Sequence, residues 1–195
     1  MNVKISHVNN LTDARYFAAA GVRFLGFCCN PGASQYCSVS RISEICQWIE
    51  GPEFVLDFDG WQSEQEIETI LSYVTVQAVH FGAFSTYQSS FEIPVFKDFI
   101  FENIADADFT QVDFPVIRSV KEFSGFLDTD LDIINHKMGG KVFYLDLPFE
   151  VSDLDRLIST FPNAGLVLRG GAEEKTGFKS FEQLDSIFDA LELVE

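Results

Sequence analysis

The sequence lacks the features of membrane, secreted and zinc-binding proteins. No apolar run reaches the roughly 18 residues that would indicate a membrane-spanning helix. The opening residues MNVKISH contain no apolar signal region, so we expect a cytoplasmic protein. The four cysteines form no CxxC pair and have no nearby histidine, so we expect no metal and no cofactor. Adjacent Cys28 and Cys29 are predicted to be small buried hydrophobic residues.

Basic residues are also scarce. The chain has 13 Lys and Arg against 30 Asp and Glu, for a formal net charge of −17. Such a charge repels polyanions, so nucleic acid and acidic membranes are not expected partners. A small anion can still bind where local donors gather. The sequence leaves the oligomeric state open.

No Pro- or Ser-rich linker divides the 195 residues, so we expect one domain, 1–195. The 21 phenylalanines recur in short apolar runs that resemble strands buried on both faces. Eight strands are predicted in this way: 3–6, 22–27, 54–58, 76–81, 94–100, 114–119, 141–146 and 165–169.

Helical patterns lie between these strands. One helix is predicted after a cap at Asn10 or Thr12 and ends at Gly21, and a capping box marks another over 63–73. The remaining predicted helices are 127–138, 152–161 and 180–193, with weaker patterns at 83–91 and 102–112. This alternation predicts an α/β fold, a compact (β/α)₈ TIM barrel.

The carboxyl ends of the strands form the functional face of such a barrel. The candidate side chains there are Ser6, Asn30, Asp57 or Asp59, His80, Lys97 or Asp98, Arg118, Asp146 and Arg169. Four of the bases, Lys4, Lys97, Arg118 and Arg169, lie inside predicted strands, where an unpaired charge is unfavourable. They either form structural ion pairs with Asp57, Asp98 and Asp146, or they line a mouth that binds a small anionic ligand.

The loops after the last two strands bear on phosphate binding. Arg169, Gly170 and Gly171 would let backbone N–H groups and a guanidinium approach an anion. After the seventh strand, Pro148 removes an N–H and Asp146 adds a carboxylate. Only half of a phosphate cradle is therefore predicted.

Two stretches resemble the phosphoribosylanthranilate isomerase family. The first stretch is similar to the family's V-K-I-C-G, D-A, A-G, G-F-x-F-x-P and S-P-R-Y-V-S. The matching residues are VKISH at 3–7, DA at 13–14, Gly21, LGFCCNP at 25–31 and SQYCS at 34–38. The second stretch is similar to the family's V-D-V-S-S-G-V-E and P-G-x-K-D, through LVLRGGAE at 166–173, Gly177 and Lys179. Between the two stretches, VHFG at 79–82 is only partly similar to the family's Q-L-H-G. The resemblance implies a (β/α)₈ barrel and an Amadori isomerisation in tryptophan biosynthesis.

The same resemblance shows where the chain departs from that chemistry. Ser6 stands where the family has its basic cysteine, and Ile117, Arg118 and Ser119 stand where an acidic aspartate is expected. Gln35 replaces the substrate-binding arginine, and the glycine pair after the seventh strand is absent. A serine needs a neighbouring base. His7, in place of the family's glycine, could supply one, although adjacent strand residues point to opposite faces.

Three hypotheses follow. The first is a divergent member without isomerase activity, a pseudoenzyme that binds a small anionic or phosphorylated molecule through Gln35, Lys97, Arg118, Arg169, Gly170 and Gly171. The second is an active isomerase with a rebuilt acid–base set, drawn from Ser6, Asp57, His80 and Asp146. The third is a non-catalytic barrel that binds a partner protein, which a closed, ion-paired mouth would favour.

Overall fold

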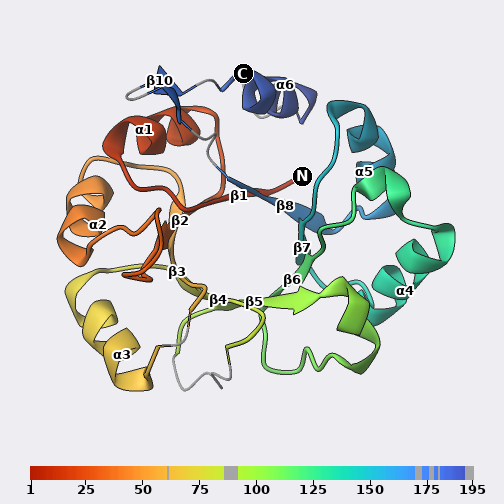
Figure 1. The fold of residues 1–195 in the computed structure, drawn as a ribbon, viewed down its shortest axis with the longest axis horizontal. Coiled ribbons are helices and arrows are strands. Elements are labelled where there is room, and N and C mark those ends of the chain that lie inside the picture. The colour runs from red at the N-terminus through yellow and green to blue at the C-terminus, as the bar shows by residue number, and fades with distance from the viewer. Residues whose placement is uncertain (61, 86–91, 170–172, 176–177, 180, 192–195) are drawn as a thin grey trace.

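Eight parallel strands close into a barrel in sequence order, as Figure 1 shows. The structure is a computed structural model that describes residues 1–60, 62–85, 92–169, 173–175, 178–179 and 181–191, with only the backbone of 173–175 and 178–179. The strands are β1 (Val3–Ser6), β2 (Phe24–Cys28), β3 (Glu53–Phe58), β4 (Ala78–Phe81), β5 (Val95–Ile100), β6 (Phe114–Arg118), β7 (Phe143–Asp146) and β8 (Ala164–Arg169). The predicted (β/α)₈ barrel is confirmed.

Helices surround the barrel on its outside (Figure 1). They are α1 (Leu11–Ala19), α2 (Val39–Cys46), α3 (Glu64–Tyr73), α4 (Asp128–Met138), α5 (Leu154–Thr160) and α6 (Glu182–Ala190). Short 3₁₀ helices η1 (Phe101–Asp106), η2 (Phe123–Gly125) and η3 (Val151–Asp153) and a hairpin of β9 (Glu173–Lys175) and β10 (Phe178–Lys179) complete the described elements. In the part of the chain that the structure describes, no helix is both long enough and apolar enough to cross a membrane.

Several helices begin or end at the capping residues that the sequence predicts. The Asn10 side chain accepts a hydrogen bond from the backbone N–H of Asp13 at the start of α1. Ser63 and Glu66 form the predicted capping box of α3. Gly139, in the left-handed conformation with φ of 55°, ends α4. The weaker pattern at 102–112 corresponds only to the short η1, and part of 83–91 lies outside the described residues.

The barrel has two apolar layers. One lies between strands and helices, and the other fills the lumen with Phe24, Val55, Ala78, Phe96, Val116, Tyr144 and Val167. Alternation along the strands assigns each residue to one layer or the other. Gly165 faces the lumen, because a Cβ there would lie 2.3 Å from the Tyr144 ring. The lumen is therefore a packed core with no open channel at this level.

Candidate functional site

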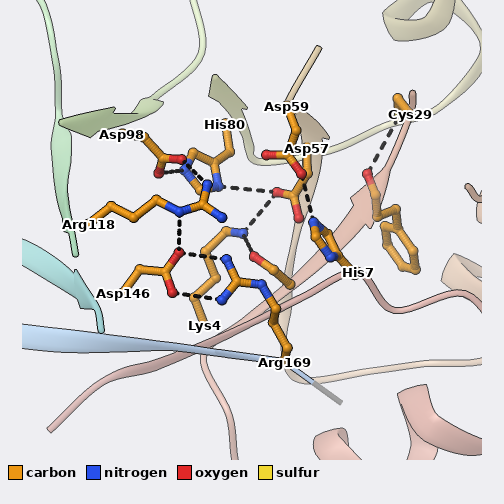
Figure 2. Close-up of polar contacts among 12 residues, drawn as sticks. Lys4, His7, Cys29, Asp57, Asp59, His80, Asp98, Arg118, Asp146 and Arg169 are labelled. Atoms are coloured by element: carbon orange, nitrogen blue, oxygen red, sulfur yellow. Dashed lines mark hydrogen bonds and ion pairs between the residues drawn. The ribbon is translucent and has the colours of Figure 1, made fainter. Parts of the chain in front are cut away.

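A ring of polar side chains lies directly above the apolar core of the lumen. Strand side chains repeat every second residue, so the residue two positions beyond a lumen-facing apolar residue faces the lumen too. Asp57, His80, Asp98, Arg118, Asp146 and Arg169 stand in this relation to the core residues of their strands, and Lys4 and Ser6 of β1 join them. We call these eight residues the polar ring. The charged members and His80 come from β1 and from β3 to β8. Figure 2 shows them converging on one network of contacts.

The β1 side of the polar ring is buried. Lys4 Nζ donates to Asp57 Oδ1 at 2.8 Å and to Ser6 Oγ at 2.6 Å. Burial alone would raise the pKa of Asp57, but the Lys4 ammonium and the His80 imidazole together outweigh burial and hold that pKa well below its usual range. Gly26 makes room for the pair, because a Cβ there would lie 2.4 Å from Asp57 Oδ2 and 2.7 Å from Lys4 Nζ.

His80 bridges two carboxylates at the centre of the polar ring. Its Nε2 lies 2.8 Å from Asp98 Oδ1, and its Nδ1 lies 3.4 Å from Asp57 Oδ1, too poorly aligned for a hydrogen bond. Burial and the Lys4 ammonium lower the pKa of His80, while Asp98 and Asp57 raise it more strongly, to about 8. The protonated imidazole is therefore stabilised near neutral pH.

The β6–β8 side of the polar ring is open to solvent. Arg169 donates through Nη1 and Nη2 to the two oxygens of Asp146 at 2.7 and 2.6 Å. Arg118 donates through Nη1 to Asp98 Oδ2 at 2.9 Å, and its Nε lies 3.4 Å from Asp146 Oδ2. The two arginine side chains nevertheless remain 39% and 40% exposed. The ion pairs of the first alternative are thus present for Arg118, Arg169 and Lys4, and the exposure of the two arginines is compatible with the second alternative as well.

A pocket of about 420 Å³ opens beside the two arginines. Arg118, Asp146 and Arg169 line it together with the loop after β7, Val167 and Leu168 of β8, and Gln183, Leu184 and Ile187 of α6. Its size is within the range of small-molecule sites. The pocket therefore combines an apolar wall with two half-exposed guanidinium groups.

Two of the predicted binding residues stand apart from this pocket. Lys97 alternates with the lumen-facing Phe96 and Asp98, and its Nζ donates to the carbonyl oxygens of Gly82 and Ser85 at 2.7 and 2.6 Å. Burial lowers the pKa of Lys97. Gln35 accepts a hydrogen bond from Asn9 Nδ2 at 2.8 Å. Gly170 and Gly171, the other predicted phosphate ligands, lie outside the described residues.

Ser6 and His7 do not form the pair that the sequence allowed. Ser6 Oγ accepts from Lys4, whereas His7 Nε2 lies 2.7 Å from Asp59 Oδ2. His7 has a φ of 64°, so β1 ends at Ser6 and its simple alternation ends there as well. The glycine that the family has at this position is a signal for such a left-handed turn. Sequence reasoning missed both the Lys4–Ser6 bond and the His7–Asp59 pair.

The structure limits the acid–base chemistry at the two positions where the resemblance places the family's base and acid. Ser6 faces an ammonium, and such a neighbour does not remove the hydroxyl proton. The position of the expected acid carries Ile117, Arg118 and Ser119, none of which is a carboxylic acid, and a guanidinium is a poor general acid in proteins. In the described residues, no group of three or more His, Cys, Asp or Glu is arranged to hold a metal ion. Cys28 and Cys29 are buried, as the sequence predicts, and burial raises the pKa of both thiols.

Solved structures of known function resemble the whole barrel. Phosphoribosyl anthranilate isomerase from Thermus thermophilus is 21% identical with a TM-score of 0.76, covering 100% of both chains. TrpF from Jonesia denitrificans is 15% identical with a TM-score of 0.78, covering 100% of this chain and 98% of its own. A phosphoribosyl anthranilate isomerase in complex with reduced 1-(o-carboxyphenylamino)-1-deoxyribulose 5-phosphate is 17% identical with a TM-score of 0.74, covering 98% of each chain.

No protein-family model matches the sequence, and no curated protein sequence matches it either. At these identities the structural likeness establishes the fold alone. The resemblance identified from the sequence is thus confirmed at that level: the chain has the barrel fold of the phosphoribosylanthranilate isomerases.

Proposed function

We propose that this protein is a phosphoribosylanthranilate isomerase-like barrel that binds a small phosphorylated molecule and does not catalyse the Amadori reaction. The observation that carries the proposal is the placement of two half-exposed guanidinium groups, Arg118 and Arg169, on one wall of the pocket of about 420 Å³. The ligand would be held at the carboxyl ends of β6 and β8.

The chemistry of the two arginines supports an anionic ligand. A guanidinium has five N–H donors, and Asp98 and Asp146 engage only some of them. The remaining donors are suited to phosphate oxygens, which planar guanidinium groups bind through paired hydrogen bonds. A related barrel has been solved with a 5-phosphate compound bound, which makes a phosphorylated ligand the first class to test.

The substitutions in the polar ring support the absence of isomerase activity. Ser6 stands at the position of the base and accepts a hydrogen bond from the Lys4 ammonium, and the stretch from Ile117 to Ser119 supplies no carboxylic acid at the position of the acid. Loss of one acid–base partner lowers a rate by about 10² to 10⁴-fold. The mouth is ion-paired but open, so it lacks the closure that would favour a purely protein-binding role.

Thermal unfolding in the presence of inorganic phosphate, ribose 5-phosphate and anthranilate tests the binding proposal. At ten times its dissociation constant, a ligand should raise the Tm by about 3–6 °C. We expect this rise with the two phosphates and none with anthranilate. Arg169→Met should remove most of it, while Arg15→Met on the exposed side of α1 serves as the matched control. Absence of any shift at millimolar phosphate would contradict the proposal.

Complementation tests the proposed lack of isomerase activity. The gene should fail to restore growth of a tryptophan auxotroph that lacks the isomerase, although the protein accumulates in folded form. A known isomerase expressed from the same vector provides the positive control. Growth of the complemented strain without tryptophan would show that the second hypothesis, an isomerase with a rebuilt acid–base set, is correct.

A further inference from the structure

Of the four bases inside the strands, Lys97 is the one that lies apart from the polar ring. It stands on β5 between the lumen-facing Phe96 and Asp98, so its side chain faces the layer outside the barrel. Its Nζ donates to the carbonyl oxygens of Gly82 and Ser85 at 2.7 and 2.6 Å. Among the described residues, Nζ forms these two contacts with neutral carbonyls and no ion pair with a carboxylate.

The two carbonyl acceptors belong to a turn that the rest of the structure holds in place. The N–H of Gly82 donates to the carbonyl oxygen of Phe58 at 3.1 Å, and the N–H of Ser85 donates to that of Gly82 at 3.1 Å. A Cβ at Gly82 would lie 2.9 Å from the backbone oxygen of Asp59, so the turn packs directly on the residue that follows β3. The amine of Lys97 is therefore oriented by fixed partners.

These contacts match the hydrogen-bonding capacity of a neutral amine. An ammonium has three N–H donors and no lone pair, whereas the neutral amine has two donors and one lone pair. The two carbonyl oxygens can accept both donors of the neutral form, which leaves its lone pair pointing away from them. Burial lowers the pKa of Lys97 and outweighs the nearby charge of Asp98, which raises it. The reactive form is thus more accessible than in an exposed lysine.

Lys97 lines a pocket of about 330 Å³, which is large enough for a small molecule. The apolar part of its wall includes Phe84, Phe99 and Ile100. Phe84 is 90% exposed, so its ring offers an uncovered apolar surface at the pocket. Asp106, at the end of η1, adds a carboxylate that would repel an anion. The pocket therefore suits an uncharged molecule with an apolar group.

We propose that Lys97 is a nucleophilic amine that binds a small, uncharged aldehyde covalently, as an imine, in this pocket. A desolvated lysine amine is a common protein nucleophile toward carbonyl groups. The described residues that line this pocket are all different from those that line the pocket of about 420 Å³ beside the arginines. The aldehyde site and the proposed phosphate site are therefore independent, and each can be tested without the other.

Imine formation balances without an oxidant or a reductant. The lone pair of Nζ forms a bond to the carbonyl carbon, and the π electrons of the C=O bond move to the oxygen, which takes up one amine hydrogen. That oxygen then leaves as water with the second amine hydrogen, and a C=N bond remains. The protonated imine has one N–H, which one of the two backbone carbonyls can accept. Hydrolysis returns the amine and the aldehyde.

Reductive trapping of the wild-type protein tests the proposal at each lysine separately. Butanal is the probe, and sodium cyanoborohydride reduces any imine to a stable secondary amine that peptide mapping by mass spectrometry locates. At pH 7 we expect Lys97 to be labelled at least about tenfold faster than Lys137. Lys137 is the matched reference, because it is exposed and its Nζ also donates to a backbone carbonyl, that of Ala105. Glyoxylate, an anionic aldehyde, should show a smaller preference for Lys97.

Lys97→Arg retains a cation that can donate to the two carbonyls but removes the amine nucleophile. By intact mass, this variant should form one rapid label fewer than the wild type, whereas Lys137→Arg should form as many as the wild type. Labelling of Lys97 no faster than that of Lys137 in the folded wild-type protein would overturn the proposal, and this result does not depend on the folding of any variant. An equal number of rapid labels in the wild type and a folded Lys97→Arg would overturn it as well.

Discussion

Asp146 and Arg169 are joined by two parallel hydrogen bonds across the ends of β7 and β8, each oxygen of the carboxylate accepting from one terminal nitrogen. The same carboxylate lies 3.4 Å from the Nε of Arg118. One carboxylate therefore contacts both arginines at the pocket. Under the proposed function, Asp146 would compete with the ligand for these donors and so set the affinity of the pocket for anions.

Asp146→Asn should strengthen phosphate binding. The amide keeps the shape of the side chain but removes the negative charge, so Arg118 and Arg169 gain donors and net positive charge for a ligand. We expect affinity for inorganic phosphate to rise several-fold, with a small loss of stability because both arginines are partly solvated. Titration calorimetry at low ionic strength measures the change. Weaker phosphate binding by the variant would mean that Asp146 positions the arginines and does not compete for them.

The buried ion pair of Lys4 and Asp57 should show strong coupling. Lys4→Met leaves the Asp57 carboxylate buried without its cation, which should lower the free energy of unfolding by about 3–5 kcal/mol. Combining it with Asp57→Asn removes the buried charge, so the double variant should recover much of the loss. Urea unfolding of the two single variants and the double variant gives the coupling. Simple additivity of the two single effects would contradict it.

Gly26 should be intolerant of even one added methyl group. Gly26→Ala would place a Cβ 2.4 Å from Asp57 Oδ2, and both partners of the buried ion pair are fixed by packing. We expect a loss of about 1–3 kcal/mol in the free energy of unfolding. Gly32→Ala is the matched control, because nothing lies within 4 Å of its added Cβ. Equal stabilities for the two variants would show that the ion pair can shift to make room.

Stability should depend on pH through His80. Burial and Lys4 lower its pKa, but Asp98 and Asp57 raise it more, to about 8, which is above the value near 6.5 of an unfolded chain. The folded state therefore binds this proton more tightly. Its contribution, about 2 kcal/mol, is complete below about pH 6.5 and is lost as pH rises through 8.

Urea unfolding between pH 6 and pH 9 measures this contribution. The wild-type protein should lose stability over that range more steeply than His80→Gln, and the difference between the two isolates the group. His136→Gln should follow the wild-type curve, because this side chain is exposed on α4. Parallel curves for wild type and His80→Gln would contradict the assignment of the proton to His80.

The barrel could be predicted from the sequence because its signals are local. Near-continuous apolar runs marked all eight strands, and the side chains of Asn10, Ser63 and Glu66 marked the starts of two helices. The second helix, Val39–Cys46, was not assigned bounds in advance. The helix predicted over 102–112 was too long, since only the short 3₁₀ helix η1 forms there.

The site was harder to predict because it depends on which face of its strand each side chain occupies. Lys97 and Asp98 are adjacent on β5, and the sequence alone left open which of them faces the lumen. The buried Phe96 decides this in favour of Asp98, and Lys97 points to the other face. At His7 the usual alternation fails, because the left-handed residue turns the chain away from the strand. The choice of ion-pair partners depends on strand register, which only the closed barrel provides.

Calorimetric titration of ribose 5-phosphate into the wild-type protein and an Arg118→Met, Arg169→Met double variant tests the central claim most directly. We expect one site per chain in the wild type and at least tenfold weaker binding in the double variant, with Arg15→Met indistinguishable from wild type. Binding of equal strength in the wild type and the double variant, or no binding to the wild type at millimolar ligand, would contradict it.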